Sequence, residues 1–170
     1  MRRSLMAAAV AALPAFGLVP GFTGLAATAA SAATTGCVLP EEANAKATRI
    51  AAGLNAFRAS EGLRPVSHAR QLSRAAQTQA CDMASSGSFS HRGSDGSNHR
   101  ARVERTGYCA GVSAENLAWG YPRAQQIITG WQGSPGHRQV MALDRAQEFG
   151  VGIAQGAKGP VWVLVMAQPC

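Results

Sequence analysis

Four short segments of this sequence carry side chains that could do chemistry. They are Ser90-His91, Ala114-Glu115-Asn116, Trp131 and Ser134-Pro135-Gly136-His137-Arg138. The sequence contains no His-Glu-x-x-His zinc motif, no phosphate-binding Walker loop and no Gly-x-Ser-x-Gly nucleophile elbow. Any shared chemistry therefore requires the fold to bring distant histidines and a carboxylate together.

His137 has a local environment that the sequence defines well. Ser134 is a favourable N-cap and Pro135 suits the first position of a helix, so His137 falls in the first turn. The positive end of a helix dipole disfavours imidazolium, and we expect this ring to be neutral at pH 7. A neutral imidazole can accept a hydrogen bond or coordinate a metal.

The elements that must position these residues follow from hydrophobic periodicity and from Gly and Pro. Apolar spacing predicts helices over 43–59, 68–85, 101–106 and 123–132, and another that starts at Ser134. We interpret residues 87–99 as a loop and residues 108–122, which include Glu115, as irregular chain. Residues 149–154 and 161–166 predict an antiparallel hairpin. The second strand is apolar almost throughout, which favours an α+β layered domain with helices over a central sheet.

The N-terminus predicts export. Arg2 and Arg3 precede an apolar run, and Ala30-Ser31-Ala32 offers small residues for a signal peptidase. We expect residues 1–32 to be a cleaved signal peptide, with no transmembrane segment left after cleavage and a secreted or cell-envelope location. The chain has 16 Lys and Arg against 9 Asp and Glu, and losing Arg2 and Arg3 would leave a formal charge of +5. These cations are scattered without interleaved aromatic residues, so we expect no nucleic-acid partner.

All four cysteines lie after residue 32, and an even number in an exported chain favours two disulfides. Four cysteines allow three connectivities. If the first two helices run antiparallel, Cys37 approaches Cys81 and leaves Cys109 to pair with Cys170. We carry this connectivity as a hypothesis.

The order of motifs along the chain resembles the bacterial branch of the CAP superfamily, named for cysteine-rich secretory proteins, antigen five and pathogenesis-related one. Each motif is short, but they occur in the same order as in that family. They are Leu54-Asn55-x-x-Arg58, Gly62-Leu63-x-Pro65, Leu72 with Ala75-Ala76, Asp82-Met83-Ala84, Ser90-His91, Asp95-Gly96, Arg102, Gly107-Tyr108, Glu115-Asn116-Leu117-Ala118-x-Gly120, Trp131-x-x-Ser134-Pro135-Gly136-His137-Arg138, Gly150-Val151-Gly152 and Trp162-Val163.

The resemblance implies an α–β–α sandwich with a surface cleft. It divides the chain into a signal peptide (1–32), an N-terminal tail with the start of the first helix (33–46) and a CAP domain (47–170). Two His and two Glu line the family's cleft, and the matching positions here are His91, Glu115 and His137. The family's second Glu matches Ser134, which departs from the pattern. The three matched residues are an open ligand set that suits zinc or another divalent cation.

Three functions follow as hypotheses. The first is a monomeric binding module, rather than an enzyme, whose His/Glu cleft takes a metal or an extracellular, envelope or lipid ligand. The second is a metal- or His-dependent hydrolase of envelope or extracellular substrates, with His91 or His137 as general base and Glu115 orienting it. A close contact between a Ser hydroxyl and a His nitrogen in an open cleft would favour hydrolysis. The third is a purely structural envelope protein.

Each matched residue also has a structural interpretation that stays open here. His91 could cap a turn, Glu115 could fasten its loop to backbone N–H groups, and His137 could pack on Trp131. His68 and His99 are interpreted as surface histidines, and Arg102 either binds an anion or covers apolar surface.

Overall fold

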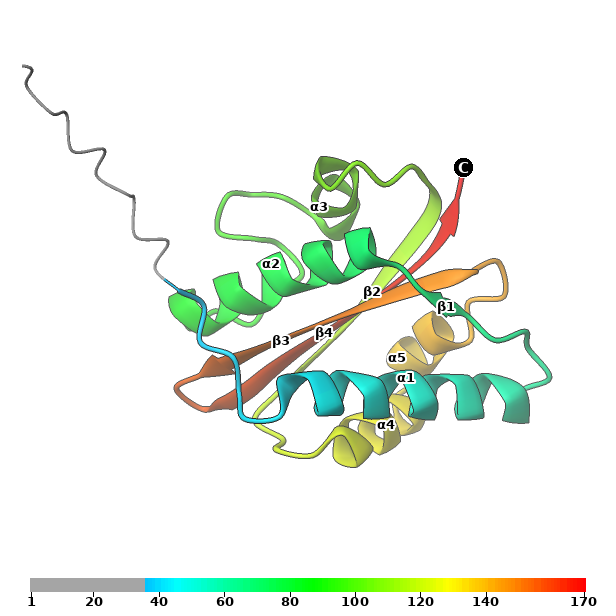
Figure 1. The fold of residues 1–170 in the computed structure, drawn as a ribbon, viewed down its shortest axis with the longest axis horizontal. Coiled ribbons are helices and arrows are strands. Elements are labelled where there is room, and N and C mark those ends of the chain that lie inside the picture. The colour runs from blue at the N-terminus through cyan, green and yellow to red at the C-terminus, as the bar shows by residue number, and fades with distance from the viewer. Residues whose placement is uncertain (1–35) are drawn as a thin grey trace, which may run out of the picture. The chain divides into compact units, whose positions relative to one another are not determined.

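A computed structural model describes residues 36–170 as three layers, with a sheet between two layers of helices (Figure 1). The predicted signal peptide lies outside the described residues. In chain order the elements are α1 (Ala43–Ser60), β1 (Ser67–His68), α2 (Arg70–Ser86), α3 (His99–Arg105), β2 (Ala110–Trp119), α4 (Ala124–Gly133), α5 (Pro135–Met141), β3 (Glu148–Gly156) and β4 (Gly159–Pro169).

The sheet has the strand order β1-β3-β4-β2. β4 pairs antiparallel with both β3 and β2, while the two-residue β1 adds a short parallel pairing to β3. The predicted hairpin is therefore confirmed as β3 and β4. The strand β4 is apolar throughout its centre because both of its faces are covered.

Alternation along β4 divides the core into two parts. Trp162, Leu164 and Met166 pack with α1, α4 and α5, whereas Val161, Val163 and Val165 pack with α2 and α3. All six side chains are buried. This confirms the α+β layered domain predicted from the apolar strand and the α–β–α sandwich that the family resemblance implies.

α2 lies unusually close to β3 because two glycines of the strand leave room for its backbone. A Cβ atom on Gly150 would lie 2.2 Å from the Leu72 carbonyl carbon, and one on Gly152 would lie 2.3 Å from that of Ala76. Separations this short exclude any larger residue unless the helix moves. The Gly-x-Gly pattern in β3 therefore fixes the position of α2.

Two predictions about the secondary structure were wrong. Residues 110–119, expected to be irregular, form β2, and His68, expected to begin a helix, lies in β1. β2 lacks a visible alternation because its central polar residues, Glu115 and Asn116, are buried with hydrogen-bond partners. α2 begins only at Arg70, since His68 and Ala69 continue the extended segment that pairs with β3.

Both predicted disulfides are present in the structure. Cys37 bonds to Cys81 and Cys109 bonds to Cys170, with Cα–Cα distances of 5.3 and 5.4 Å. α1 and α2 run in opposite directions, which brings the segment before α1 to the end of α2 (Figure 1). The two bridges fasten the N-terminal segment and the C-terminus to the layered core.

Candidate functional site

The free edge of β2 gathers residues from both helical layers. Successive residues of a strand point to opposite faces of the sheet. Glu115, paired with Val165, faces the α2 and α3 layer, and Asn116, paired with Leu164, faces the layer of α4 and α5. Groups from the two layers can therefore meet beside this edge strand.

Glu115 is the centre of a buried charge network. One of its oxygens accepts from Arg102 Nη2 at 2.8 Å and the other accepts from His91 Nδ1 at 2.9 Å. The Glu115 and Arg102 side chains are 1% and 2% exposed, whereas that of His91 is 59% exposed. The carboxylate thus holds an accessible imidazole in a fixed orientation, and Nε2 is the ring nitrogen that Glu115 leaves free.

Hydrogen bonds from neighbouring side chains also fix the backbone around His91. Arg102 Nη2 also donates to the His91 carbonyl at 3.2 Å, and the buried Gln79 donates to the Ser90 carbonyl at 2.6 Å. These bonds replace the regular hydrogen bonding that a loop lacks. The loop that carries His91 is therefore positioned by α2 and α3.

His137 approaches from the other layer, at the start of α5. Asn116 Nδ2 donates to the His137 carbonyl at 2.9 Å, which ties this turn to β2. Burial lowers the pKa of His137, and the charge of the neighbouring His91 lowers it further. The imidazole is therefore neutral at pH 7, as its place in the sequence predicts, although the causes here are burial and His91.

A largely apolar pocket of about 370 Å³ opens beside His137. Aromatic residues form much of its wall, and they are Phe89, Trp119, Tyr121 and Trp131. Trp131 is buried and donates to the Leu117 carbonyl at 3.1 Å, while Phe89 and Tyr121 are more than half exposed. The pocket thus has a fixed inner wall and an open aromatic rim.

The metal ligands expected from the sequence have a different arrangement. Within residues 36–170, no group of three His, Cys, Asp or Glu side chains is placed to hold a metal ion. Both Glu115 oxygens are already engaged, by Arg102 and by His91, so the donors left for a metal are the two imidazoles. These residues do not fit a three-ligand zinc site in this conformation.

The structure brings the three predicted residues to one edge, and it adds two features that sequence reasoning missed. Arg102 is the buried partner of Glu115, rather than an anion site or a cover for apolar surface. Phe89 and Trp119 form the pocket rim with ring centroids 6.2 Å apart. No local sequence signal marks either feature, because both depend on contacts that the tertiary fold makes.

Residues 52–167 match the sequence profile of the CAP, or cysteine-rich secretory protein, family. The chain belongs to this family. Its CAP domain is 26% identical over 123 residues to the uncharacterized protein YkwD of Bacillus subtilis (strain 168), covering 72% of this chain and 47% of that protein. The chain thus spans about half the length of this relative.

Two solved structures share the fold of this CAP domain. One is an extracellular protein of Bacillus anthracis str. Ames that contains an SCP domain, with a TM-score of 0.68 and 21% identity over 74% of this chain and 41% of that one. The other is an outer surface protein of Borrelia burgdorferi, with a TM-score of 0.67 and 14% identity over 72% of this chain and 92% of that one. At these identities the likeness is one of fold.

None of the helices in residues 36–170 combines the length and the apolar character that crossing a membrane requires.

Proposed function

We propose that this CAP domain is an extracellular binding module whose cleft takes an amphipathic, lipid-derived ligand of the cell envelope. The observation that carries the proposal is the aromatic pocket of about 370 Å³ that ends at His137. Ligand pockets of this size typically combine apolar walls with a few fixed polar groups. Here His137 is the fixed polar group in the pocket wall, and the oriented His91 is its neighbour.

The two parts of such a ligand would meet different surfaces. An acyl chain would lie against Trp131 and Ile127, and its burial would supply most of the binding free energy. A polar head group would bond to His137 and to Nε2 of His91. Glu115 and Arg102 would act by holding His91, because both are too buried to reach a ligand.

Two observations support an extracellular setting. Both disulfides require an oxidising compartment, and they close the N-terminal segment and the C-terminus onto the domain. The structures that share the fold are described as extracellular and outer surface proteins. The signal peptide predicted for residues 1–32 agrees with both.

A titration with medium-chain lysophosphatidylglycerol, kept below its micelle concentration, tests the proposal. Tryptophan fluorescence should change saturably because Trp119 and Trp131 line the pocket. Phe89→Ala should weaken binding about tenfold, or about 1.4 kcal/mol, because Phe89 forms part of the rim. Leu39→Ala is the matched control, since Leu39 is 55% exposed outside the cleft and Phe89 is 53% exposed. No saturable change in the parent protein, or equal losses in both variants, would contradict the proposal.

A divalent metal stays a separate prediction for this cleft. Binding zinc with three ligands would require Glu115 to release His91 or Arg102, and the latter would leave a buried charge unpaired. A zinc titration monitored by the unfolding temperature tests this directly, since a specific ligand stabilises the fold by mass action. A rise that His91→Ala and His137→Ala both abolish would support the metal site, and no rise would remove it.

A hydrolase of envelope polymers is the second candidate, and the contact between His91 and Glu115 favours it. A carboxylate that orients an imidazole 2.9 Å away is the arrangement of a general base. The nucleophile would be water. Comparing turnover of peptides, esters and envelope polymers by the parent protein and by Glu115→Gln tests this candidate; equal rates would reject it.

A further inference from the structure

A histidine–serine pair lies at the opposite edge of the sheet. His68 Nε2 and Ser73 Oγ are 2.8 Å apart, within the range for a nucleophile and its base. His68 is exposed and Ser73 is half-buried, so both are accessible from solvent. Neither belongs to the His91 cleft, which lies at the β2 edge.

Contacts with β3 fix both members of the pair. His68 pairs with Phe149 in the parallel register of β1 and β3, and its ring meets that of Phe149 edge-on at 5.9 Å and 70°. Ser73 Oγ accepts a hydrogen bond from the Val151 N–H at 3.2 Å. Because this bond uses a lone pair of the Ser73 oxygen, the hydroxyl proton is free to point at His68.

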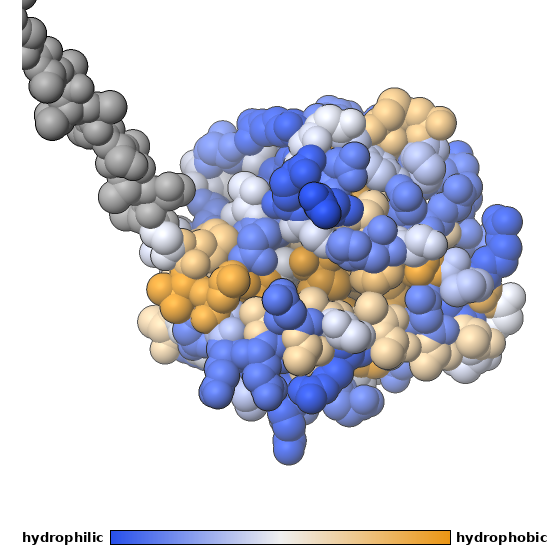
Figure 2. Space-filling view, viewed as in Figure 1, coloured by the Kyte–Doolittle hydropathy of each residue, from blue (hydrophilic) through white to orange (hydrophobic). Residues whose placement is uncertain are grey.

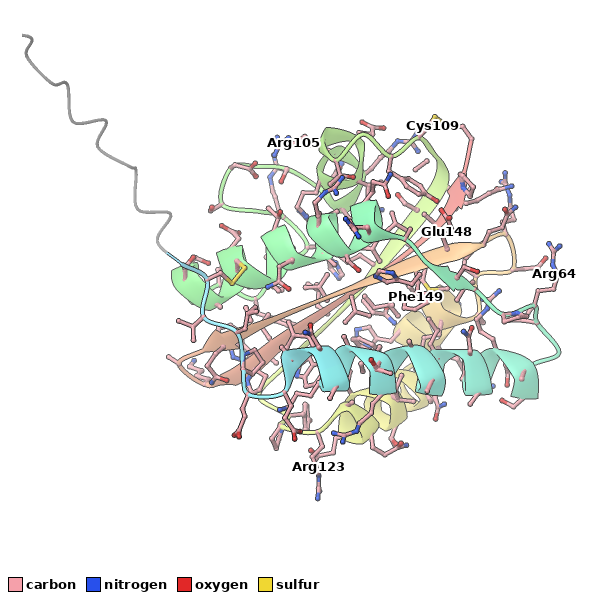
Figure 3. All side chains as sticks on the ribbon, viewed as in Figure 1. Arg64, Arg105, Cys109, Arg123, Glu148 and Phe149 are labelled. Atoms are coloured by element: carbon pink, nitrogen blue, oxygen red, sulfur yellow. A yellow bond between two sulfur atoms is a disulfide. The ribbon has the colours of Figure 1, made fainter. Side chains whose placement is uncertain are left out.

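The pair borders a pocket of about 330 Å³ between α1 and α2. Ala47, Ala51, Phe149 and Val151 supply apolar walls, and Asn44 and Thr48 supply polar ones. Phe149 lies between the two helices (Figure 3), and Figure 2 shows apolar surface in the band between them. The pocket therefore suits a small acyl group beside a hydroxyl nucleophile.

We propose that Ser73 and His68 form a nucleophile–base dyad that hydrolyses small carboxylic esters in this pocket. Ser73 Oγ attacks the ester carbonyl carbon while His68 Nε2 takes the hydroxyl proton. The bond to the leaving oxygen breaks, and the departing alkoxide takes that proton and leaves as an alcohol. Water then attacks the acyl-serine with His68 as base, which releases the carboxylic acid and restores the Ser73 hydroxyl.

Two features limit the expected rate of ester hydrolysis. The hydrogen bonds of residues 36–170 give His68 Nδ1 no carboxylate partner, so the pair lacks the third member of a triad. The shallow setting of His68 also leaves the reaction open to water. We therefore expect slow turnover with short activated esters, which a covalent probe detects more sensitively than product release.

The test is labelling of the purified full chain with a fluorophosphonate probe, followed by peptide mapping. Attack by Ser73 Oγ on phosphorus expels fluoride, and His68 takes the proton. We expect the label on Ser73 and hydrolysis of p-nitrophenyl acetate at a rate above that of buffer. Ser73→Ala should remove both, and His68→Gln should slow labelling by at least about 100-fold.

Control variants test whether the labelling depends on the Ser73–His68 pair. Ser67→Ala removes an exposed hydroxyl beside His68 and should label like the parent protein. His68→Gln leaves the Ser73–Val151 bond in place and so keeps the test valid if Ser73→Ala fails to fold. No label on Ser73 of the folded parent, or equal labelling of His68→Gln, would overturn the proposal. Either failure leaves lysophosphatidylglycerol binding at the cleft unaffected, because that site shares no residue with the dyad.

Discussion

The two edges of one sheet carry histidine sites that are built in opposite ways. At the β2 edge, His91 is held by a buried carboxylate and guanidinium that come from different elements. At the β1 edge, His68 meets a serine only five residues further along the chain, with no charged partner among the hydrogen bonds of residues 36–170. The groups of the first site come from distant parts of the chain, whereas both members of the second come from one short strand and the helix that follows it.

Because Glu115 is part of a buried charge network, removing its side chain should lower the free energy of unfolding strongly. Glu115→Ala leaves Arg102 buried and unpaired and should destabilise the protein by about 3–5 kcal/mol. Urea unfolding measures the change. The matched control is Glu104→Ala, which breaks an exposed ion pair with Arg100 and should cost less than about 1 kcal/mol. Similar losses in the two variants would show that Glu115 is not the buried anchor of the cleft.

The packing of α2 on β3 should be sensitive to backbone contact rather than to charge. Gly152→Ala places a methyl group against the α2 backbone and should cost about 1–3 kcal/mol or more. Gly130→Ala in α4 is the control at the cleft, because its Cβ atom would meet nothing within 4 Å and the change favours helix. Chemical denaturation compares the two. A Gly152→Ala protein as stable as the parent would mean that α2 does not lie this close to β3.

The smallest expected effect is the pH dependence of stability that His137 causes. The fold lowers the pKa of His137, so the unfolded chain binds its proton more tightly. Protonation therefore favours unfolding, and the contribution of His137 to stability is complete above about pH 6.5 and lost as the pH falls. The unfolding temperature of His137→Gln should consequently fall less than that of the parent between pH 7.5 and pH 5. Parallel curves for the two proteins would contradict the assigned environment.

Much of the fold could be predicted because local patterns and global packing agree. The helix over 43–59 and the hairpin after residue 148 follow from periodicity, and the hypothesis of an antiparallel first helix pair leads to both disulfides. β2 could not be predicted, because Glu115 and Asn116 interrupt its apolar pattern and their hydrogen-bond partners lie far away in sequence. The burial of a polar side chain can be predicted only when its hydrogen-bond partner is known.

The candidate site, too, could be predicted only in part from the sequence. His91, Glu115 and His137 could be chosen from the order of the family motifs, and the structure brings them to one edge of the sheet. The role of Arg102 could not be chosen, because a buried and a surface-covering arginine look alike in a sequence. The contact between His68 and Ser73 was also missed, since it requires His68 to be in a strand and Ser73 in the first turns of the next helix.

The most direct test of the cleft follows the four histidine side chains by NMR while medium-chain lysophosphatidylglycerol is added. We expect the ring resonances of His91 and His137 to shift together and saturate, while those of His68 and His99 stay in place. Saturable shifts confined to His68, or no shift at His91 and His137, would contradict a ligand site at the β2 edge.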